Sequence, residues 1–205
     1  MMSQAAHVFL ALVDSASHQA RESLMHILGI SGSLRQGSLN TAALRACASL
    51  LPEGVTLSLA DLSEVPPYNE DIRTQGLPSS VQQLREQIKA ADAILIATPE
   101  YNYSFPGVLK NAIDWASRPP DQPFDGKPIA LMGATPGGLG TSRAQYHLRQ
   151  VFIYLNGHVL NRPEVMISAA PTKFDNDGKL TDESTAENLR KLLAVLCDAA
   201  RQRNP

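Results

Sequence analysis

The segment from Asp92 to Thr98 constrains the fold most, because its centre, Ala93-Ile94-Leu95-Ile96-Ala97, is apolar without interruption. A strand with one face in water alternates apolar and polar residues, whereas a strand covered on both faces does not. The run therefore predicts a central strand of a parallel sheet with helices on both sides. The loop that follows, Pro99 to Ser104, is rich in aromatic and amide groups, and loops at the carboxyl ends of such strands commonly bind ligands.

Strand-like and helix-like segments alternate along the rest of the chain. Further strands are expected at 25–30, 55–59 and 129–132, and an irregular fifth strand at 159–160 and 165–167, which Arg162-Pro163 interrupts. Helical spacing follows each strand, with helices expected near 40–51, 79–90, 106–118, 142–155 and 182–203. Parallel neighbours need crossover helices, so the pattern predicts a three-layer αβα sandwich around a five-stranded parallel sheet.

Two helix starts carry cap signals. Ser79 or Ser80 is expected to cap the second helix, and Ser142 with Gln145 has the spacing of a capping box. The loop around residues 66–69 contains two consecutive prolines, so it is not expected to form a central strand.

Composition bounds the organisation of the chain. Its 205 residues, 43% of them hydrophobic, suit one domain, which we assign to residues 25–205. The apolar run Val8 to Val13 is too short for a usual signal-peptide core, and no Lys or Arg precedes it. Because Met25 directly precedes the first convincing strand, residues 1–24 are expected to be a disordered or loosely packed upstream extension. A net charge of -2 without charge runs predicts neither a nucleic-acid nor a membrane partner. Cys47 and Cys197 lie in apolar segments and are expected to be buried, unpaired thiols in the reducing cytoplasm.

The loop Ser31 to Asn40 has the composition of a phosphate site. It joins the first strand to a helix, so its backbone N–H groups and the helix dipole face the same point. Ser33, Ser38 and Asn40 add side-chain donors, and Arg35 adds a charged fork. The simpler reading is an ordinary capped helix start, but the position after the first strand favours phosphate binding.

Other signatures are missing from the sequence. The loop lacks the Gly-Lys-Ser/Thr of a P-loop, the spacing Gly-x-Gly-x-x-Gly and the Gly-x-Ser-x-Gly of a hydrolase elbow. The five histidines show no metal-ligand spacing, so no metal site is expected. His147 is expected to be structural or to lie at an interface. Helix-packing and hydrogen-bonding roles, not catalytic ones, are expected for Lys110, Asn111, Asp114 and Trp115.

In a sheet of flavodoxin-like order 2-1-3-4-5, the loops after strands one, three and four are neighbours at the switch point. The loop Pro99 to Ser104 offers backbone groups and an Asn that can match the donor and acceptor edge of a flavin ring. A second glycine-rich loop, Gly133 to Gly140, follows the fourth strand. Taken alone, the aromatic loop is more often a packed connection, and only a neighbouring phosphate loop makes it a cofactor candidate.

Two long motifs resemble the NADPH-dependent FMN reductase family, and within it the bacterial chromate and quinone reductases. The first is Gly32-Ser33-Leu34-Arg35-x-x-Ser38-x-Asn40, and the second runs from Pro99 to Trp115. Lys127-Pro128 and the segment Arg143 to Gln150 also resemble that subgroup. The resemblance implies the flavodoxin-like fold and FMN bound without a covalent link.

Carried onto matching positions, the resemblance implies three groups of cofactor-binding residues. The first loop would bind the FMN phosphate, through Ser31, Ser33, Arg35, Ser38, Leu39 and Asn40. The aromatic loop would line the isoalloxazine ring, through Pro99, Glu100, Tyr101, Asn102 and Ser104. The third loop approaches the other edge of the ring with Ala134, Thr135 and Gly137.

The function implied is a cytoplasmic NAD(P)H-dependent FMN reductase or quinone reductase. Hydride from NADPH or NADH would pass through FMN to a quinone, with chromate, azo compounds and free flavin as other acceptors, and no catalytic side chain is expected. The alternative is a non-enzymatic FMN module, either an electron carrier or a regulator. The apolar residues near Phe152, Ile153 and Tyr154 exceed what one core face needs and favour a homodimer or homotetramer.

Overall fold

Six strands form one parallel sheet in the computed structural model, which describes residues 24–203. The strands are β1 (Met25–Ser31), β2 (Val55–Ala60), β3 (Ala93–Ala97), β4 (Pro128–Ala134), β5 (His158–Val159) and β6 (Val165–Ile167). Their order is β2-β1-β3-β4-β5, and β6 also pairs with β4. The predicted order 2-1-3-4-5 is confirmed, with the fifth strand present as two short pieces on either side of Arg162-Pro163.

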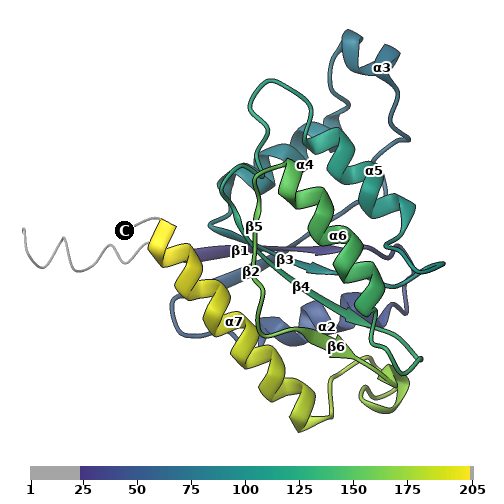
Figure 1. Ribbon diagram of the computed structural model, residues 1–205, viewed down its shortest axis with the longest axis vertical. Coiled ribbons are helices and arrows are strands. Elements are labelled where there is room, and N and C mark those ends of the chain that lie inside the picture. The colour runs from purple at the N-terminus through teal and green to yellow at the C-terminus, as the bar shows by residue number, and fades with distance from the viewer. Residues whose placement is uncertain (1–23, 204–205) are drawn as a thin grey trace, which may run out of the picture.

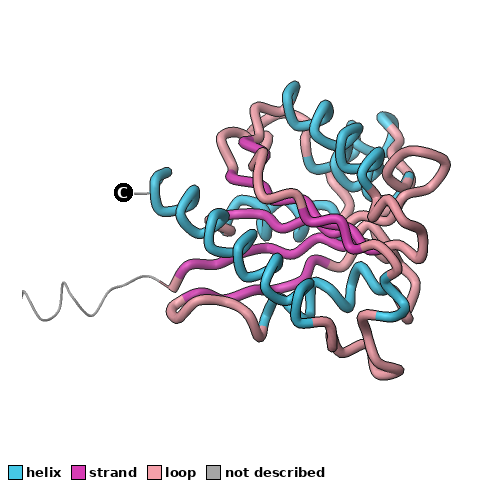
Figure 2. The backbone as a smooth tube through the Cα atoms, turned by 60° about the horizontal axis from the view of Figure 1, so that its bottom comes forward, coloured by secondary structure: helices cyan, strands magenta, loops and turns pink. Residues whose placement is uncertain are grey.

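Helices cover both faces of this sheet, as Figure 1 shows and Figure 2 repeats from a second direction. The helices are α2 (Leu39–Ala48), α3 (Glu70–Gln75), α4 (Ser79–Ala90), α5 (Gly107–Ala116), α6 (Ser142–Tyr154) and α7 (Glu183–Arg203), with a 3₁₀ turn η1 (Ala170–Thr172). Helices α2 and α7 share one apolar core with the sheet, and α4, α5 and α6 share the other. The predicted three-layer αβα sandwich is confirmed.

Strand β3 shows why its sequence is apolar throughout. Leu95 packs into the core beneath α2 and α7, whereas Ile94 and Ile96 pack into the core beneath α4, α5 and α6. All five residues of the strand are fully buried. Burial of each of these large side chains contributes roughly 1.5–3 kcal/mol. The central position predicted from the run is therefore correct.

Helix α5 anchors the segment that follows β2. Asn111 donates from Nδ2 to the Pro66 carbonyl at 2.8 Å and accepts at Oδ1 from the Tyr68 N–H at 2.7 Å. Trp115 Nε1 donates to the same Pro66 carbonyl, and the Tyr68 ring packs edge-on against the indole with 4.7 Å between centroids. The packing roles expected for Asn111 and Trp115 are thus confirmed, and Lys110 forms an ion pair with Asp114 one turn away on the same helix.

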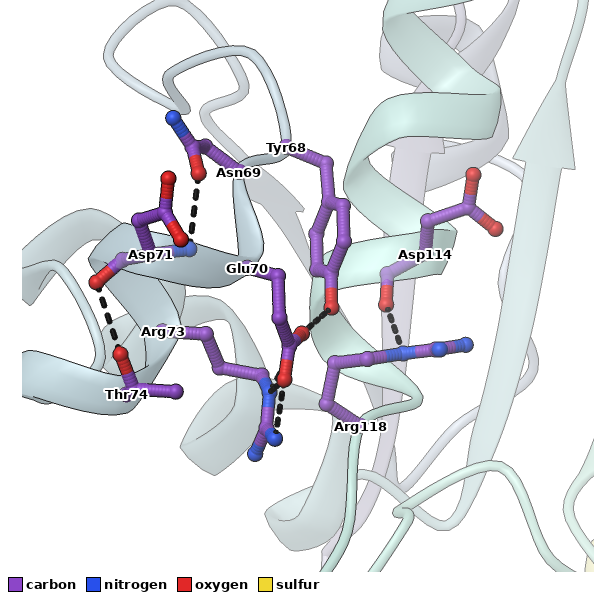
Figure 3. A network of polar contacts seen from close by, with 8 residues as sticks. All are labelled: Tyr68, Asn69, Glu70, Asp71, Arg73, Thr74, Asp114 and Arg118. Carbon is purple, nitrogen blue, oxygen red and sulfur yellow. Dashed lines mark hydrogen bonds and ion pairs between the residues drawn. The ribbon is translucent and has the colours of Figure 1, made fainter.

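Helix α3, which the sequence pattern did not predict, extends from this anchored segment (Figure 1). None of its residues is buried, so it has no apolar periodicity to reveal it. Figure 3 shows the polar contacts that hold it: Tyr68 donates to Glu70, and Glu70 pairs with Arg73. The Asn69 side chain caps the helix by accepting from the Asp71 N–H at 2.8 Å.

The cap predicted for α4 was wrong. Pro78 occupies the N-cap position, and no side chain bonds the first turn. Ser80 instead donates its hydroxyl to the Glu64 carbonyl at 2.9 Å. The Ser80 hydroxyl therefore bonds a loop carbonyl and does not cap the helix, and the sequence spacing alone does not distinguish these two roles.

The two cysteines are buried and unpaired, as expected. Burial raises the pKa of the Cys47 thiol to about 12.

The predicted extension at residues 1–24 lies, apart from Leu24, outside the described residues. Between residues 24 and 203, no helix combines the length and apolar character needed to cross a bilayer.

Candidate functional site

A cleft of about 660 Å³ lies at the carboxyl edge of the sheet, where the loops after β1, β3 and β4 meet the segment after β6. This volume is within the range of small-molecule sites. The lining residues are Ser33, Arg35, Gly37, Ser38, Leu39, Asn40, Pro99, Glu100, Tyr101, Ala134, Thr135, Pro136, Pro171, Phe174, Asp175 and Asn176. The three loops singled out from the sequence therefore line one cleft.

The loop after β1 is shaped by its own hydroxyl groups. Ser31 and Thr41 share a hydrogen bond of 2.8 Å between their hydroxyl oxygens, and Ser31 Oγ accepts from the Ser33 N–H at 3.3 Å. Ser38 caps α2 by accepting from the Thr41 N–H at 3.3 Å. The first N–H groups of α2, at Leu39 and Asn40, have no carbonyl within the helix to bond. The cleft therefore contains the positive end of a helix dipole.

Asn40 is buried and bonds the backbone of Ala134 in both directions. Its Nδ2 donates to the Ala134 carbonyl at 3.0 Å, and its Oδ1 accepts from the Ala134 N–H at 2.9 Å. This pair joins the start of α2 to the end of β4. One Nδ2 hydrogen remains for a ligand.

Arg35 is the cation of the cleft. Its side chain is exposed and has no ion-pair partner among residues 24–203. Its own N–H bonds the Ser33 hydroxyl at 3.4 Å, which keeps the backbone of the loop folded back on itself. The guanidinium is therefore available for an anion, in the position expected from the sequence.

The aromatic loop is a tight turn. Tyr101 and Ser104 exchange two backbone hydrogen bonds of 2.8 and 3.0 Å, and Asn102 and Tyr103 between them have φ values of 51° and 67°. Two successive positive φ values define a type I′ turn, which Asn adopts readily and Tyr does not. Tyr101 and Tyr103 expose 56% and 64% of their surface. Tyr101 lines the cleft, whereas Asn102 and Ser104 are not among its lining residues.

Glu100 contributes to the cleft, but its carboxylate bonds the start of α6. Oε2 accepts from the N–H groups of Arg143 and Ala144 at 3.1 and 3.2 Å. Oε1 accepts from Arg143 Nε at 2.5 Å and forms an ion pair with Arg143 Nη2. Any contact of Glu100 with a ring in the cleft therefore falls to its backbone.

The capping box predicted at Ser142 and Gln145 is wrong. Thr141 is the N-cap residue, with a φ of 69° and no side-chain cap bond. Gln145 points inward and donates to the Val165 carbonyl at 3.1 Å and to the Thr141 hydroxyl at 3.2 Å. Glu100 supplies the missing cap from a distant part of the chain.

The end of β4 packs closely against the end of β3 and against Thr141. A Cβ on Gly133 would overlap both the Thr98 carbonyl and the Thr141 hydroxyl, so the close contact of these segments requires glycine. Ala134 and Thr135 line the cleft as expected. Gly137 does not, because its backbone is occupied with Thr135 Oγ1 and with the N–H of Ala169.

The wall after β6 was missed by the sequence prediction. Residues 173–181 form a small hairpin in which Asp175 N–H donates to the Lys179 carbonyl and Thr181 N–H donates to the Lys173 carbonyl, both at 2.9 Å. Its turn places Asp175 and Asn176 on the cleft. The turn chemistry of Asp175-Asn176-Asp177-Gly178 is visible in the sequence. The missed lining residues are Gly37, Pro136, Pro171, Phe174, Asp175 and Asn176.

Four predicted residues lie outside the lining of the cleft: Ser31, Asn102, Ser104 and Gly137. Ser31 shapes the first loop, and Ser104 closes the turn with Tyr101 and lies 3.3 Å from His147 Nδ1. His147 therefore has a structural contact, as expected. These residues support the loops whose other members line the cleft.

A sequence model of the NADPH-dependent FMN reductase family matches residues 25–172. An NAD(P)H-dependent FMN reductase of Pseudomonas aeruginosa is 58% identical over 170 residues, which are 83% of this chain and 92% of that protein. A quinone reductase of Escherichia coli is 41% identical over 168 residues, 80% of this chain and 89% of that protein. The solved structure of FerB, a flavoenzyme NAD(P)H:(acceptor) oxidoreductase of Paracoccus denitrificans, superposes with a TM-score of 0.80 at 35% identity, covering 87% of this chain and 98% of that one.

Proposed function

This chain belongs to the NADPH-dependent FMN reductase family, and we propose that the cleft at the carboxyl edge of its sheet is where FMN binds and reacts. The protein is an FMN-dependent NAD(P)H oxidoreductase. One observation carries the placement of the cofactor. One wall of a single cleft carries a helix N-terminus and the guanidinium of Arg35, which has no ion-pair partner among residues 24–203, and another wall carries an aromatic turn. FMN has a phosphate at one end and a flat ring at the other.

The phosphate is assigned to the loop after β1. Arg35 supplies the charge, and the hydroxyls of Ser33 and Ser38 can donate, because the Ser38 oxygen is only an acceptor in the helix cap. The N–H groups of Leu39 and Asn40 add two backbone donors at the end of the dipole. Ser31 acts through the loop conformation and does not touch the anion.

The ring is assigned to the space between the aromatic loop and the loop after β4. Backbone groups at Pro99, Glu100 and Tyr101 on one side and at Ala134 and Thr135 on the other present fixed donors and acceptors. FMN, when bound, supplies the redox chemistry by accepting hydride and passing electrons on. The residues of the chain bind and orient the ring, and the mechanism requires no side chain to transfer a proton.

We assign quinones as the acceptor class. Tyr101 and Tyr103 expose aromatic surface at the tip of the loop that lines the cleft, and flat aromatic acceptors stack on such surfaces. The quinone reductase of Escherichia coli and the FMN reductase of Pseudomonas aeruginosa named above support quinones and free flavin respectively. Chromate and azo compounds are further acceptors for a reduced ring that is open to solvent.

We further propose a homodimer or homotetramer that functions in the cytoplasm. Phe152 packs in the core, but its neighbours Ile153 and Tyr154 expose 78% and 89% of their surface, and Tyr146 on the same helix is also exposed. An apolar surface of this kind suits burial against a second subunit. The unpaired thiols of Cys47 and Cys197 suit a reducing compartment. Light scattering of the purified protein tests the assembly, and a monomer would contradict it.

The test of the function uses the purified full chain. Its visible spectrum should show bound FMN, anaerobic NADPH or NADH should bleach that spectrum, and a quinone should restore it over many turnovers. Colourless protein that does not take up FMN would overturn the proposal. Bleaching without sustained NAD(P)H consumption in the presence of a quinone would identify an electron carrier instead of a reductase.

A further inference from the structure

The Glu100 carboxylate is almost fully buried, with 9% of the side chain exposed, and both of its oxygens bond the start of α6. Together they accept two backbone N–H groups of α6 and two groups of the Arg143 guanidinium. A buried carboxylate with this many charge-assisted partners has a fixed position. Because Glu100 belongs to the aromatic loop, those bonds fix the loop as well.

Helix α6 depends on the same contact. Its N-cap residue Thr141 has a left-handed backbone and supplies no side-chain bond. The Ser142 N–H bonds the Leu139 carbonyl, so the N–H groups of Arg143 and Ala144 are the ones that need a partner from elsewhere. Glu100, 43 positions earlier in the chain than Arg143, satisfies both of them. The carboxylate also places a negative charge at the positive end of the helix dipole.

Arg143 makes a second contact with the same loop. Its guanidinium carbon lies 3.7 Å from the centroid of the Tyr103 ring, so one side chain bonds Glu100 and covers Tyr103. Tyr103 has a φ of 67°, a conformation that costs a non-glycine residue free energy and persists only where other contacts hold it. Arg143 therefore bonds the aromatic loop at both Glu100 and Tyr103.

We propose that Glu100 and Arg143 are a positioning pair that holds the aromatic loop in its ring-binding shape and keeps the ring's surroundings electrically neutral. The proposal rests on the binding of FMN in the cleft. Glu100 carries the negative charge and lines the cleft with its backbone, and Arg143 cancels that charge. Neither side chain needs to touch the ring.

The neutrality has a measurable consequence. Hydride transfer adds one proton and two electrons to the ring, so the bound cofactor gains one negative charge until a further proton is taken up. A bare Arg143 would stabilise that charge, and a bare Glu100 would oppose it. Removing either partner therefore changes the relative affinity for reduced and oxidised FMN, in opposite directions.

The test compares Glu100→Gln, Arg143→Gln and the double variant with the wild-type protein. The readouts are the dissociation constant of oxidised FMN and the midpoint potential of the bound cofactor, from which the dissociation constant of reduced FMN follows. In Glu100→Gln, the ratio of the oxidised to the reduced dissociation constant should rise roughly threefold or more, and in Arg143→Gln it should fall by a similar factor. In the double variant, the ratio should return to the wild-type value.

Two controls separate charge from general damage. Glu187→Gln and Arg201→Gln make the same charge changes on α7, outside the lining of the cleft, and should leave the potential unchanged. Arg143→Lys keeps the charge but loses the fork, so it should weaken FMN binding and lower the melting temperature of the apo-protein without moving the potential.

Shifts of the same sign in both single variants, or no shift in either, would overturn the electrostatic part of the proposal. Unchanged FMN affinity and unchanged apo-protein stability in all the Glu100 and Arg143 variants would overturn the positioning part. Failure of the wild-type protein to bind FMN would refute the underlying function instead, so the two failures are distinguishable.

Discussion

The two loops that line opposite parts of the cleft are stabilised in different ways. Most side-chain hydrogen bonds that fold the loop from Ser31 to Asn40 are local, such as those of Ser31 and Ser38 with Thr41. Two contacts reach further, from Asn40 to Ala134 and from the Gly32 N–H to the Ala97 carbonyl. The loop from Pro99 to Ser104 has the local Tyr101–Ser104 turn and is further held by residues of α6, which are Arg143, Ala144 and His147. The phosphate side is therefore largely formed by its own sequence, whereas the ring side depends on the placement of α6.

This difference suits the two tasks. A phosphate is the same charged group in every redox state of the cofactor, and a rigid cradle serves it throughout. The ring changes charge when it is reduced and must also admit two different substrates. Because the ion pair between Glu100 and Arg143 ties the aromatic loop to α6, residues of α6 can set the charge and the position of the groups around the ring.

The largest effect on stability is expected at Asn40, which joins the loop after β1 to the end of β4. Asn40→Ala removes both hydrogen bonds to Ala134 and leaves a buried N–H and a buried carbonyl without partners, which should cost about 3 kcal/mol of unfolding free energy. Denaturant unfolding of the apo-protein measures it. Asn176→Ala, which removes an exposed amide from the same cleft, is the control. A loss below about 0.5 kcal/mol in Asn40→Ala would show that this contact does not join the two sides.

Gly32→Ala should give the next largest loss. A Cβ at Gly32 would lie 3.2 Å from side-chain carbons of both Pro99 and Pro106, in the seam between the two loops. Tight packing of this kind should cost roughly 1–2 kcal/mol and weaken FMN binding. Gly37→Ala is a matched control in the same loop, because its Cβ would meet nothing within 4 Å. Equal effects of the two substitutions on the free energy of unfolding would contradict the close contact. FMN titration of Gly32→Ala against the wild-type protein measures the loss of binding.

Much of this architecture was predictable from the sequence. The buried run at β3 and the phosphate-type loop follow from local patterns, and most bonds that hold this loop are local. The alternation of strands and helices predicts a parallel sheet, and the resemblance to a flavodoxin-like family supplied the order 2-1-3-4-5. The role of the Glu100 side chain was not predictable, because its partner lies 43 positions away and a loop glutamate is ordinarily solvated. Asp175 and Asn176 were missed for a similar reason: their sequence identifies a turn but not the cleft that the turn faces.

Arg35→Ala separates binding from stability. Because Arg35 is exposed and unpaired within the described residues, its removal should leave the melting temperature unchanged. Loss of a charge-assisted contact should weaken FMN binding by about tenfold, whereas riboflavin, which lacks the phosphate, should bind as before. Arg45→Ala is the control for charge, because Arg45 is an exposed arginine further along α2. A parallel loss of riboflavin binding would place Arg35 elsewhere than at the phosphate.

The smallest effect concerns the strain in the aromatic loop. Tyr103→Ala removes the stacking on Arg143 but keeps a side chain at a φ of 67°, whereas Tyr103→Gly removes both the stacking and the strain. The glycine variant should therefore be more stable than the alanine variant by up to about 1 kcal/mol. Thermal unfolding of the two variants side by side measures it. Equal stabilities would mean that the turn relaxes when Arg143 no longer holds it.

Titration of the apo-protein with FMN and with riboflavin tests the central assignment most directly. The two ligands share the ring and the ribityl chain and differ only in the phosphate that we assign to the loop after β1. We predict that FMN binds at least tenfold more tightly than riboflavin, and that Arg35→Ala removes most of this difference. Equal affinities for the two ligands in the wild-type protein would contradict the account.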